Sequence, residues 1–280
     1  MDAGRGAEAG AGSRGAVALA LEGVRKAFRG LEVLRDLSLA VREGEVYTLL
    51  GSSGSGKSVT LKIAIGLIPP DAGEVRVYGR PVSGLVEREL VEIRKLFGMV
   101  FQGAALFDSM TVFENVAYPL REHLDPPPAE LRQRVEACLE AVGLPRAGPL
   151  MPAELSGGMR KRVGVARAIA LEPRIVLYDE PTTGLDPGNS LRIGRLILEL
   201  RERLGMASVV VTHDLALCEQ VSDRVGLLHR GVLAVEGGPR LLRESDHPSV
   251  RAFLTGEEGD GPPRDPRGSG EARAGPARAE

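Results

Sequence analysis

The sequence predicts an α/β fold in which a sheet of buried strands is interrupted by a helical insertion. Two observations favour this class. Strand-like and helix-like segments alternate along the chain, and residues 175–178 and 209–211 are short apolar runs of the kind found in buried parallel strands. Upstream of these runs, residues 103–170 have a mostly helical pattern.

The individual elements follow from local patterns of apolar residues and turn signals. Val17, Leu19 and Leu21 alternate as in a half-buried strand, and Arg230-Gly231 indicates a hairpin turn. Strands are predicted at residues 17–21, 46–50, 74–78, 98–101, 175–178, 209–211, 225–228 and 232–235. Helices are predicted at residues 58–67, 131–142 and 190–204.

The two ends of the chain are rich in Gly, Pro, Ala and mixed charge, so they can bury little apolar surface. We therefore predict disordered tails at residues 1–15 and 256–280 around one domain at residues 16–255. No apolar run approaches the roughly 20 residues that cross a bilayer, and residues 1–15 lack the apolar core of a signal peptide. We expect a protein that neither spans a membrane nor is exported, and that reaches a membrane only through a partner.

Overall composition argues against some classes of function. The formal net charge of −2 is close to balanced, which disfavours a protein that binds nucleic acid through bulk electrostatics. The two cysteines, Cys138 and Cys218, are far apart and lack metal-ligand spacing. We expect both to be reduced core residues of a cytosolic protein.

A glycine-rich loop between a predicted strand and a predicted helix indicates a phosphate-binding site. Its residues fit the pattern G-x-x-x-x-G-K-[ST] in full: Gly51, Ser52, Ser53, Gly54, Ser55, Gly56, Lys57 and Ser58. Glycines let successive backbone N–H groups point at phosphate oxygens, and the following helix directs its positive end to the same place. Lys57 supplies a cation for the β- and γ-phosphates, and the Ser58 hydroxyl can ligate Mg²⁺. This loop alone is compatible with kinases, GTPases, helicases and transporters.

Two carboxylates, Asp179 and Glu180, directly follow the apolar strand at residues 175–178. An aspartate at a strand end beside the phosphate loop can hold Mg²⁺ through water, and the adjacent glutamate can polarise an attacking water as a general base. The motif upstream makes this pair informative, because Leu155-Ser156-Gly157-Gly158-Met159 lies immediately before a basic helical segment at residues 160–162.

Leu-Ser-Gly-Gly before a helix, followed by an Asp-Glu strand, resembles the signature motif of ABC ATPases, and the other motifs of that family occur in order. Phe28 resembles the aromatic that stacks on adenine, and Gln102 resembles the Q-loop glutamine that senses Mg²⁺ and the γ-phosphate. Gly184-Leu185-Asp186 resembles the D-loop, and His213 resembles the switch histidine. The resemblance covers about residues 17–254.

The resemblance implies an ABC-type nucleotide-binding domain of the P-loop NTPases, with an antiparallel β subdomain and the helical insertion at about residues 103–170. The catalytic residues that it implies are Lys57, Gln102, Glu180 and His213, with Glu180 as the base and His213 holding the γ-phosphate and the attacking water. The implied Mg²⁺ ligands are Ser58, Gln102 and Asp179. The implied ATP-binding residues are Phe28, Gly51, Ser52, Ser53, Gly54, Ser55, Gly56, Lys57, Ser58, Val59, Ser156, Gly157, Gly158 and Asp186.

In this family the signature serine and glycines close on the γ-phosphate held by the P-loop of the other protomer. The resemblance therefore implies a head-to-tail homodimer around two ATP molecules, with Asp186 helping to join the two sites. ATP closes the dimer, and hydrolysis with loss of phosphate reopens it. The chain departs from the family pattern at Met159 for glutamine, Phe28 for tyrosine and Thr183-Gly184 for serine-alanine. None of these changes removes a phosphate ligand or the base.

Three segments, residues 101–123, 150–159 and 166–173, resemble the ATP-binding subunits of the Mla/Mce lipid-transport systems. This resemblance implies transport of lipid, in the first place phospholipid, between the inner membrane and the outer envelope. The implied partners are integral membrane permease subunits and an MCE-domain lipid-binding protein. The implied location is the cytoplasmic face of the inner (plasma) membrane, where the chain is peripheral and held by the permease.

Alternatives remain open at this point. Phe107, Met110 and Phe113 form either an apolar socket for a coupling helix of the permease or part of the core of the insertion. An importer of a small polar solute, or an exporter, would carry the same motifs. ABC ATPases that act on DNA or ribosomes usually have long coiled coils, zinc-binding cysteines or two ATP-binding halves, which this sequence lacks. A nucleotide kinase would have no use for the signature motif at residues 155–159.

Overall fold

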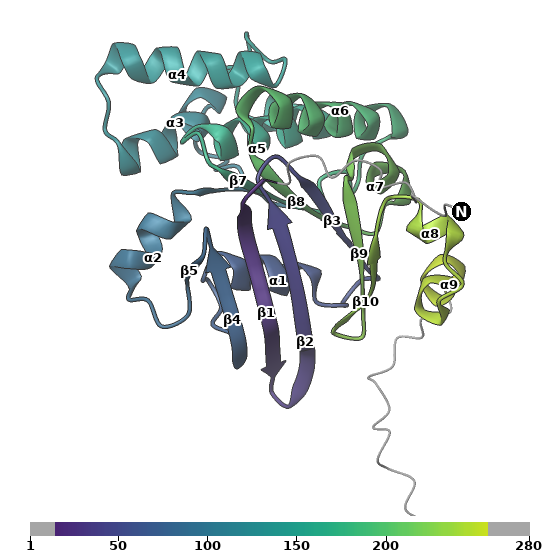
Figure 1. The fold of residues 1–280 in the computed structure, drawn as a ribbon. Helices are drawn as coiled ribbons and strands as arrows, with labels where there is room; N and C mark the ends of the chain where they lie inside the picture. Colours follow the sequence, from purple (N-terminus) through teal and green to yellow (C-terminus); the bar gives the residue numbers. More distant parts are fainter. Residues whose placement is uncertain (1–14, 257–280) are drawn as a thin grey trace, which may run out of the picture.

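The computed structural model describes residues 15–256, so the tails predicted at residues 1–15 and 256–280 lie outside the described residues except for Gly15 and Gly256 (Figure 1). The strands in this range are β1 (Val17–Phe28), β2 (Leu31–Arg42), β3 (Val46–Leu50), β4 (Ala72–Val77), β5 (Arg80–Pro81), β6 (Phe97–Val100), β7 (Ile175–Asp179), β8 (Ala207–Thr212), β9 (Arg224–His229) and β10 (Val232–Gly237). The helices are α1 (Lys57–Ala64), α2 (Glu87–Arg94), α3 (Val112–His123), α4 (Pro128–Ala141), α5 (Gly157–Ile169), α6 (Pro187–Leu204), α7 (Leu215–Val221), α8 (Leu241–Glu244) and α9 (Pro248–Thr255), with a 3-10 turn, η1, at Pro152–Glu154.

The larger sheet has the strand order β10-β9-β3-β8-β7-β6, and β10 is its one antiparallel member within the described range. The predicted parallel strands and the hairpin turn at Arg230-Gly231 are confirmed. Because β3, β6, β7 and β8 point the same way, the loops that follow them leave one edge of the sheet. That edge brings together the glycine-rich loop, Gln102, the carboxylate pair and His213.

Strand β7 shows why the apolar runs are continuous. All of its residues are buried, and successive side chains enter different hydrophobic cores. Ile175 and Leu177 pack with apolar residues of β1, β2 and α1, whereas Val176 and Tyr178 pack with those of α3, α4, α5 and α6. The parallel sheet is therefore covered on both faces, as strands of this composition require.

The smaller sheet is antiparallel, with the order β2-β1-β4-β5, which confirms the antiparallel β subdomain. Strand β2 was not predicted, and β1 runs beyond residue 21 to Phe28. Register shifts on both sides of the Val24–Leu37 pair break the alternation in the second half of β1. In β2, by contrast, Leu37, Leu39 and Val41 do alternate, and that signal was overlooked. The last pair of this ladder, Phe28 with Leu31, puts Phe28 at the tip of the hairpin.

The helical insertion predicted at residues 103–170 corresponds to α3, α4 and α5 (Figure 1). Helices α2, α7, α8 and α9 were not predicted; they span 8, 7, 4 and 8 residues, which is too short for a clear helical period, and unlike the equally short α1 they do not follow a glycine-rich loop. Helix α1 ends at Ala64, before the predicted residue 67. Among the described residues, no helix combines the length and the apolar character needed to cross a bilayer.

The two cysteines have structural surroundings. Cys218 is buried and Cys138 is half-buried, and neither forms a disulfide. Burial raises the pKa of each thiol to about 11. Because the thiolate is the reactive form, both groups are poor nucleophiles at neutral pH, in keeping with the structural role that we predict for them.

Candidate functional site

Glycines shape the loop between β3 and α1. Gly54 and Gly56 have φ angles of 79° and 108°, in the region that favours glycine. A Cβ at Gly56 would lie 2.9 Å from a methyl carbon of Leu34, and one at Gly51 would lie 2.6 Å from the carbonyl oxygen of Leu228. Helix α1 begins directly after Gly56, at Lys57. The result is a curled backbone in front of a helix N-terminus, which is an anion-binding geometry.

Two side chains of this loop fit a bound phosphate. Lys57 is only 7% exposed, and its ammonium donates hydrogen bonds to the carbonyl oxygens of Gly51 and Ser52 at 2.7 and 2.9 Å. Within the described residues, the buried Ser55 hydroxyl has no hydrogen-bond partner. A buried polar group without a partner is costly, and a phosphate oxygen in the loop would satisfy it.

Ser58 and Asp179 come together although they are 121 residues apart in the chain. The Ser58 hydroxyl donates a hydrogen bond of 2.9 Å to Oδ1 of Asp179. Burial raises the pKa of Asp179 above its ordinary value, and the hydrogen bond from Ser58 offsets part of that effect. Hydroxyl and carboxylate oxygens are the ligands that Mg²⁺ prefers, so this pair fits that ion. The exposed Gln102 follows β6 at the same edge of the sheet.

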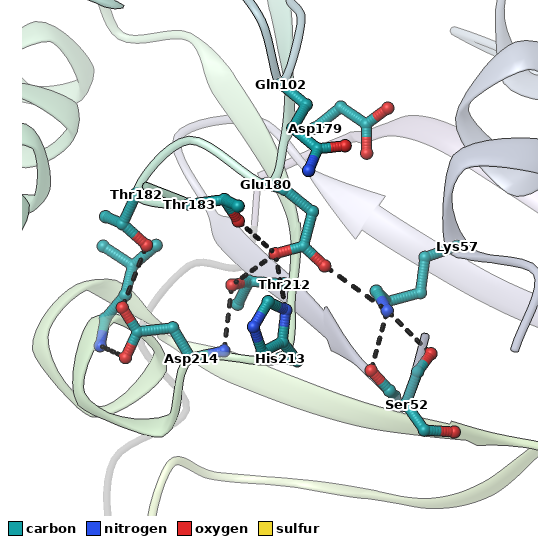
Figure 2. A network of polar contacts seen from close by, with 12 residues as sticks. Ser52, Lys57, Gln102, Asp179, Glu180, Thr182, Thr183, Thr212, His213 and Asp214 are labelled. Carbon is teal, nitrogen blue, oxygen red and sulfur yellow. Dashed lines mark hydrogen bonds and ion pairs between the residues drawn. The ribbon is translucent and has the colours of Figure 1, made fainter. Parts of the chain in front are cut away.

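Glu180 is the centre of the polar network in Figure 2. Its Oε1 lies 3.4 Å from the Lys57 ammonium, and its Oε2 lies 2.9 Å from Nδ1 of His213. The hydroxyls of Thr183 and Thr212 also donate to Oε2, at 3.3 and 3.2 Å. Burial would raise the pKa of Glu180, but the hydrogen bond from His213 and the charge of Lys57 outweigh it, and the pKa is lowered. The carboxylate is therefore ionised at neutral pH and is able to accept a proton.

The loop after β8 is held by a second carboxylate. Asp214 caps the N-terminus of α7, where its Oδ1 accepts hydrogen bonds from the backbone N–H groups of Ala216 and Leu217. Its Oδ2 accepts a bond of 2.9 Å from the Thr182 hydroxyl, as Figure 2 shows. This links the His213 loop to the loop after Glu180.

The signature motif lies at the start of α5. Ser156 caps this helix, and its hydroxyl accepts a hydrogen bond of 3.3 Å from the Met159 N–H. Asp186 caps α6. Its carboxylate accepts hydrogen bonds from the Asn189 backbone N–H at 3.0 Å and from the Asn189 side-chain amide at 2.5 Å. Within residues 15–256, no hydrogen bond connects Ser156 or Asp186 with the glycine-rich loop. The two motifs are neighbours, because the side chain of Asn189, which binds Asp186, lies against Gly158.

Phe28 is 41% exposed at the tip of the β1–β2 hairpin. The Lys26 ammonium lies 5.4 Å from the centre of its ring and is also paired with Asp71 at 2.7 Å. An exposed ring in this position offers a stacking surface for a flat ligand.

An apolar groove lies beside α3 and α5. Its lining includes Phe101, Phe107, Tyr118 and Ala168. The rings of Phe107 and Tyr118 are 5.1 Å apart, and both are partly exposed. Phe113, which we grouped with Phe107 from the sequence, instead packs against the core of the helical insertion.

Sequence reasoning missed several residues of the site. Thr183 and Thr212 bind the Glu180 carboxylate, Asn189 binds Asp186, and Lys161 donates to the carbonyl oxygens of Gln102 and Glu180. The partners of Thr212 and Lys161 lie on other elements, so local patterns gave little signal, whereas Thr183 and Asn189 each lie three residues after their partner. The basic character of residues 160–162 was the one available hint at Lys161.

A parallel α/β sheet with a phosphate loop and a buried carboxylate pair at one edge defines a P-loop ATPase. The family model described as "ABC transporter" matches residues 34–183. The chain belongs to the ABC transporter family, and it is the ATP-binding and ATP-hydrolysing subunit of such a transporter.

Two of the similar proteins are named for the transport of different molecules. The chain is 42% identical over 240 residues to the probable ribonucleotide transport ATP-binding protein mkl of Mycobacterium leprae, covering 86% of this chain and 69% of that protein. It is 43% identical over 237 residues to the intermembrane phospholipid transport system ATP-binding protein MlaF of Haemophilus influenzae, covering 84% of this chain and 89% of that protein. The resemblance to an Mla-type ATPase is thereby confirmed.

Solved structures agree on the fold. The dimeric post-hydrolysis state of the ATP-binding cassette MJ0796, bound to ADP and Pi, matches with a TM-score of 0.74 and 35% identity over 79% of this chain and 99% of that chain. CbiO1 of Clostridium perfringens, part of the ABC transporter complex cbiONQ, matches with a TM-score of 0.75 and 26% identity over 86% of this chain and 99% of that chain. These matches confirm the predicted ABC-type nucleotide-binding fold.

Proposed function

We propose that ATP hydrolysis by this chain powers the transport of a lipid, in the first place a phospholipid, between the inner membrane and the outer envelope. A separate permease and an MCE-domain protein carry the lipid, and the permease holds the chain at the cytoplasmic face of the inner membrane. The observation that carries this proposal is the 43% identity over 89% of MlaF, which is named for intermembrane phospholipid transport.

The chemistry that we assign to the site starts from Glu180. Its ionised carboxylate takes a proton from the attacking water, while His213, already within 2.9 Å of that carboxylate, orients the water and the γ-phosphate. Lys57 binds the β- and γ-phosphates, and the backbone N–H groups of the loop surround them. Mg²⁺, held by Ser58, Asp179 and Gln102, would neutralise phosphate charge.

The second half of each site comes from another copy of the chain in this proposal. Ser156, Gly157 and Gly158 present a hydroxyl and N–H groups at the start of α5, where anions bind favourably. The separation of this group from the glycine-rich loop within one chain supports a head-to-tail dimer, as does the dimeric, ADP-bound relative MJ0796.

The apolar groove lined by Phe107 and Tyr118 is where we place the permease contact. Asn115, which is fully buried, supports the loop that carries Phe107. Its side chain accepts from the Phe107 N–H at 2.8 Å and donates to the carbonyl oxygens of Phe107, Met110 and Thr111. A rigid apolar groove at the protein surface suits an inserted helix of a partner.

A second candidate function is the transport of a polar solute. It is favoured by the name of mkl, a probable ribonucleotide transport protein that is 42% identical to this chain. The fold and the ATP site serve both candidates equally, because the transported molecule contacts the other subunits.

The deciding experiment is isolation of the complete complex from membranes through a tag on the full-length chain. We expect a permease and an MCE-domain protein among the subunits, bound phospholipid, and phospholipid movement between vesicles that requires ATP and is lost in Lys57→Ala. A periplasmic solute receptor in the complex, or stimulation of ATP hydrolysis by ribonucleotides and not by phospholipid, would overturn the lipid assignment.

A further inference from the structure

Lys161 connects two parts of the site that are far apart in the sequence. It lies on α5, the helix that begins at the signature motif, and is only 6% exposed. Its ammonium donates a hydrogen bond to the carbonyl oxygen of Gln102 and another, of 3.3 Å, to the carbonyl oxygen of Glu180. Both acceptors are backbone atoms of residues that we place beside the reacting phosphate.

The backbone of Glu180 needs such support. Its φ angle is +47°, in the left-handed region that side-chain-bearing residues rarely adopt. Conformations of this kind persist where the surroundings hold them in place. The Glu180 N–H donates to the carbonyl oxygen of Val211 at 2.9 Å, and the Glu180 carbonyl accepts from the Thr183 N–H at 3.3 Å and from Lys161. The peptide on the carboxyl side of Glu180 is therefore fixed to α5.

The same helix holds the loop after Gln102 at a second point. Arg167 donates from its two terminal nitrogens to the carbonyl oxygens of Ala104 and Ala105, at 2.8 and 2.7 Å. These alanines also have positive φ angles, of 61° and 48°. A shift of α5 would consequently move the Gln102 loop and the Glu180 backbone together, because Lys161 bonds to both.

Burying an ammonium group in this position costs free energy of folding. Burial lowers the pKa of Lys161, and the negative charges of Glu180 and Asp179 counteract that effect. A core position with no role beyond packing would be filled at lower cost by an apolar side chain. The buried cation directs its donors at two carbonyl groups of the site, which suits a task in the reaction.

We propose that Lys161 is a positioning residue for ATP hydrolysis, which sets the orientation of the Glu180 carboxylate and of Gln102 relative to the signature helix α5. The inference rests on the proposed role of Glu180 as the base. It requires no contact between Lys161 and nucleotide, so its loss should lower kcat and leave nucleotide affinity unchanged.

The test compares Lys161→Met with Lys161→Gln in the full-length chain. Methionine and glutamine are both one heavy atom shorter than lysine; methionine removes every donor, whereas glutamine keeps amide donors that reach one carbonyl at most. Arg162→Met is the matched control, since Arg162 lies on the same helix and donates to the carbonyl oxygens of Val142 and Gly143, outside the site. We measure kcat, the affinity for a fluorescent ATP analogue, and thermal unfolding.

We expect Lys161→Met to lose about 10-fold to 100-fold in kcat, Lys161→Gln to lose less, and both to bind the analogue as the wild type does. The proposal is overturned if kcat of Lys161→Met stays within about two-fold of the wild type. It is also overturned if both variants lose nucleotide affinity and kcat in parallel. Should Lys161→Met not fold, Lys161→Gln decides in the same way: lowered kcat at unchanged affinity supports the proposal, and unchanged kcat contradicts it.

Failure of this proposal is distinguishable from failure of the base assignment. Glu180→Gln is measured alongside, and rapid turnover by that variant would refute the base whatever the Lys161 variants do. Neither outcome depends on which molecule the complex transports.

Discussion

The Lys57 ammonium lies 3.4 Å from the Glu180 carboxylate, and both side chains are almost completely buried. The cation that we assign to the phosphates is therefore paired with the proposed base. We expect the phosphates of ATP to compete with Glu180 for the same ammonium group. We therefore expect Lys57 to couple nucleotide binding to the environment of the proposed base.

Glu180→Gln removes both the proposed base and the negative charge that competes with phosphate for Lys57. We expect ATP affinity at least equal to that of the wild type, and kcat lowered about 100-fold to 10,000-fold. Without hydrolysis the closed dimer should accumulate, and light scattering after size exclusion with ATP would detect it. A strictly monomeric variant in saturating ATP with the permease present would contradict the two-half-site arrangement.

Asp179→Asn should stabilise the nucleotide-free chain and abolish Mg²⁺-dependent hydrolysis. Burial raises the pKa of Asp179, so its ionised form is disfavoured in the folded state. Above that pKa the charge subtracts from stability, and a neutral amide removes the penalty. We expect a rise in Tm of roughly 2 °C or more at neutral pH. The difference should shrink as the pH falls through the pKa of Asp179, and a lower Tm for the variant would contradict this account.

Phe28→Ala tests the proposed adenine contact. Loss of the exposed ring should raise KM for ATP by roughly 5-fold to 100-fold, the range found for a lost base-stacking partner, with kcat little changed. Phe28→Tyr keeps the ring and serves as the control. Equal KM values for all three proteins would place the adenine elsewhere.

Gly158→Ala tests the contact between the signature motif and Asn189. A Cβ at Gly158 would lie 2.8 Å from Oδ1 of Asn189, whose amide binds Asp186. The displaced amide would release Asp186, and we expect hydrolysis to fall by about 10-fold. Asn189→Ala removes the same amide without a clash, so it should lose about as much activity, and the double variant should lose no more than either single variant. Losses that multiply in the double variant would show that the clash with Asn189 is not the cause.

Phe107→Asp tests the groove. A charge on this exposed, apolar rim should abolish co-purification of the permease and leave ATP binding intact. Leu124→Asp is the control, because Leu124 is also exposed beside α3 but lies outside the groove lining. Permease recovery equal to that of the wild type would remove the groove from the proposed interface.

Some of the fold was predictable because local patterns suffice for it. Buried parallel strands such as β3 and β7 show as continuous apolar runs, since both of their faces are covered. Strand β2 was missed although its buried Leu37, Leu39 and Val41 alternate with less buried residues, and α7 was missed because it has only 7 residues. Phe107 and Phe113 look alike in the sequence, yet one lines the groove and the other packs on the core.

By itself the sequence determined the family and the phosphate loop, because consecutive backbone groups form that loop and its glycines and Lys57 must be contiguous. Only the tertiary structure decided which side chains meet. Glu180 with Lys57, Ser58 with Asp179, and Lys161 with two distant carbonyl oxygens are contacts between separate elements. Packing of the parallel sheet against α1 and α5 makes these contacts, and no local spacing encodes them.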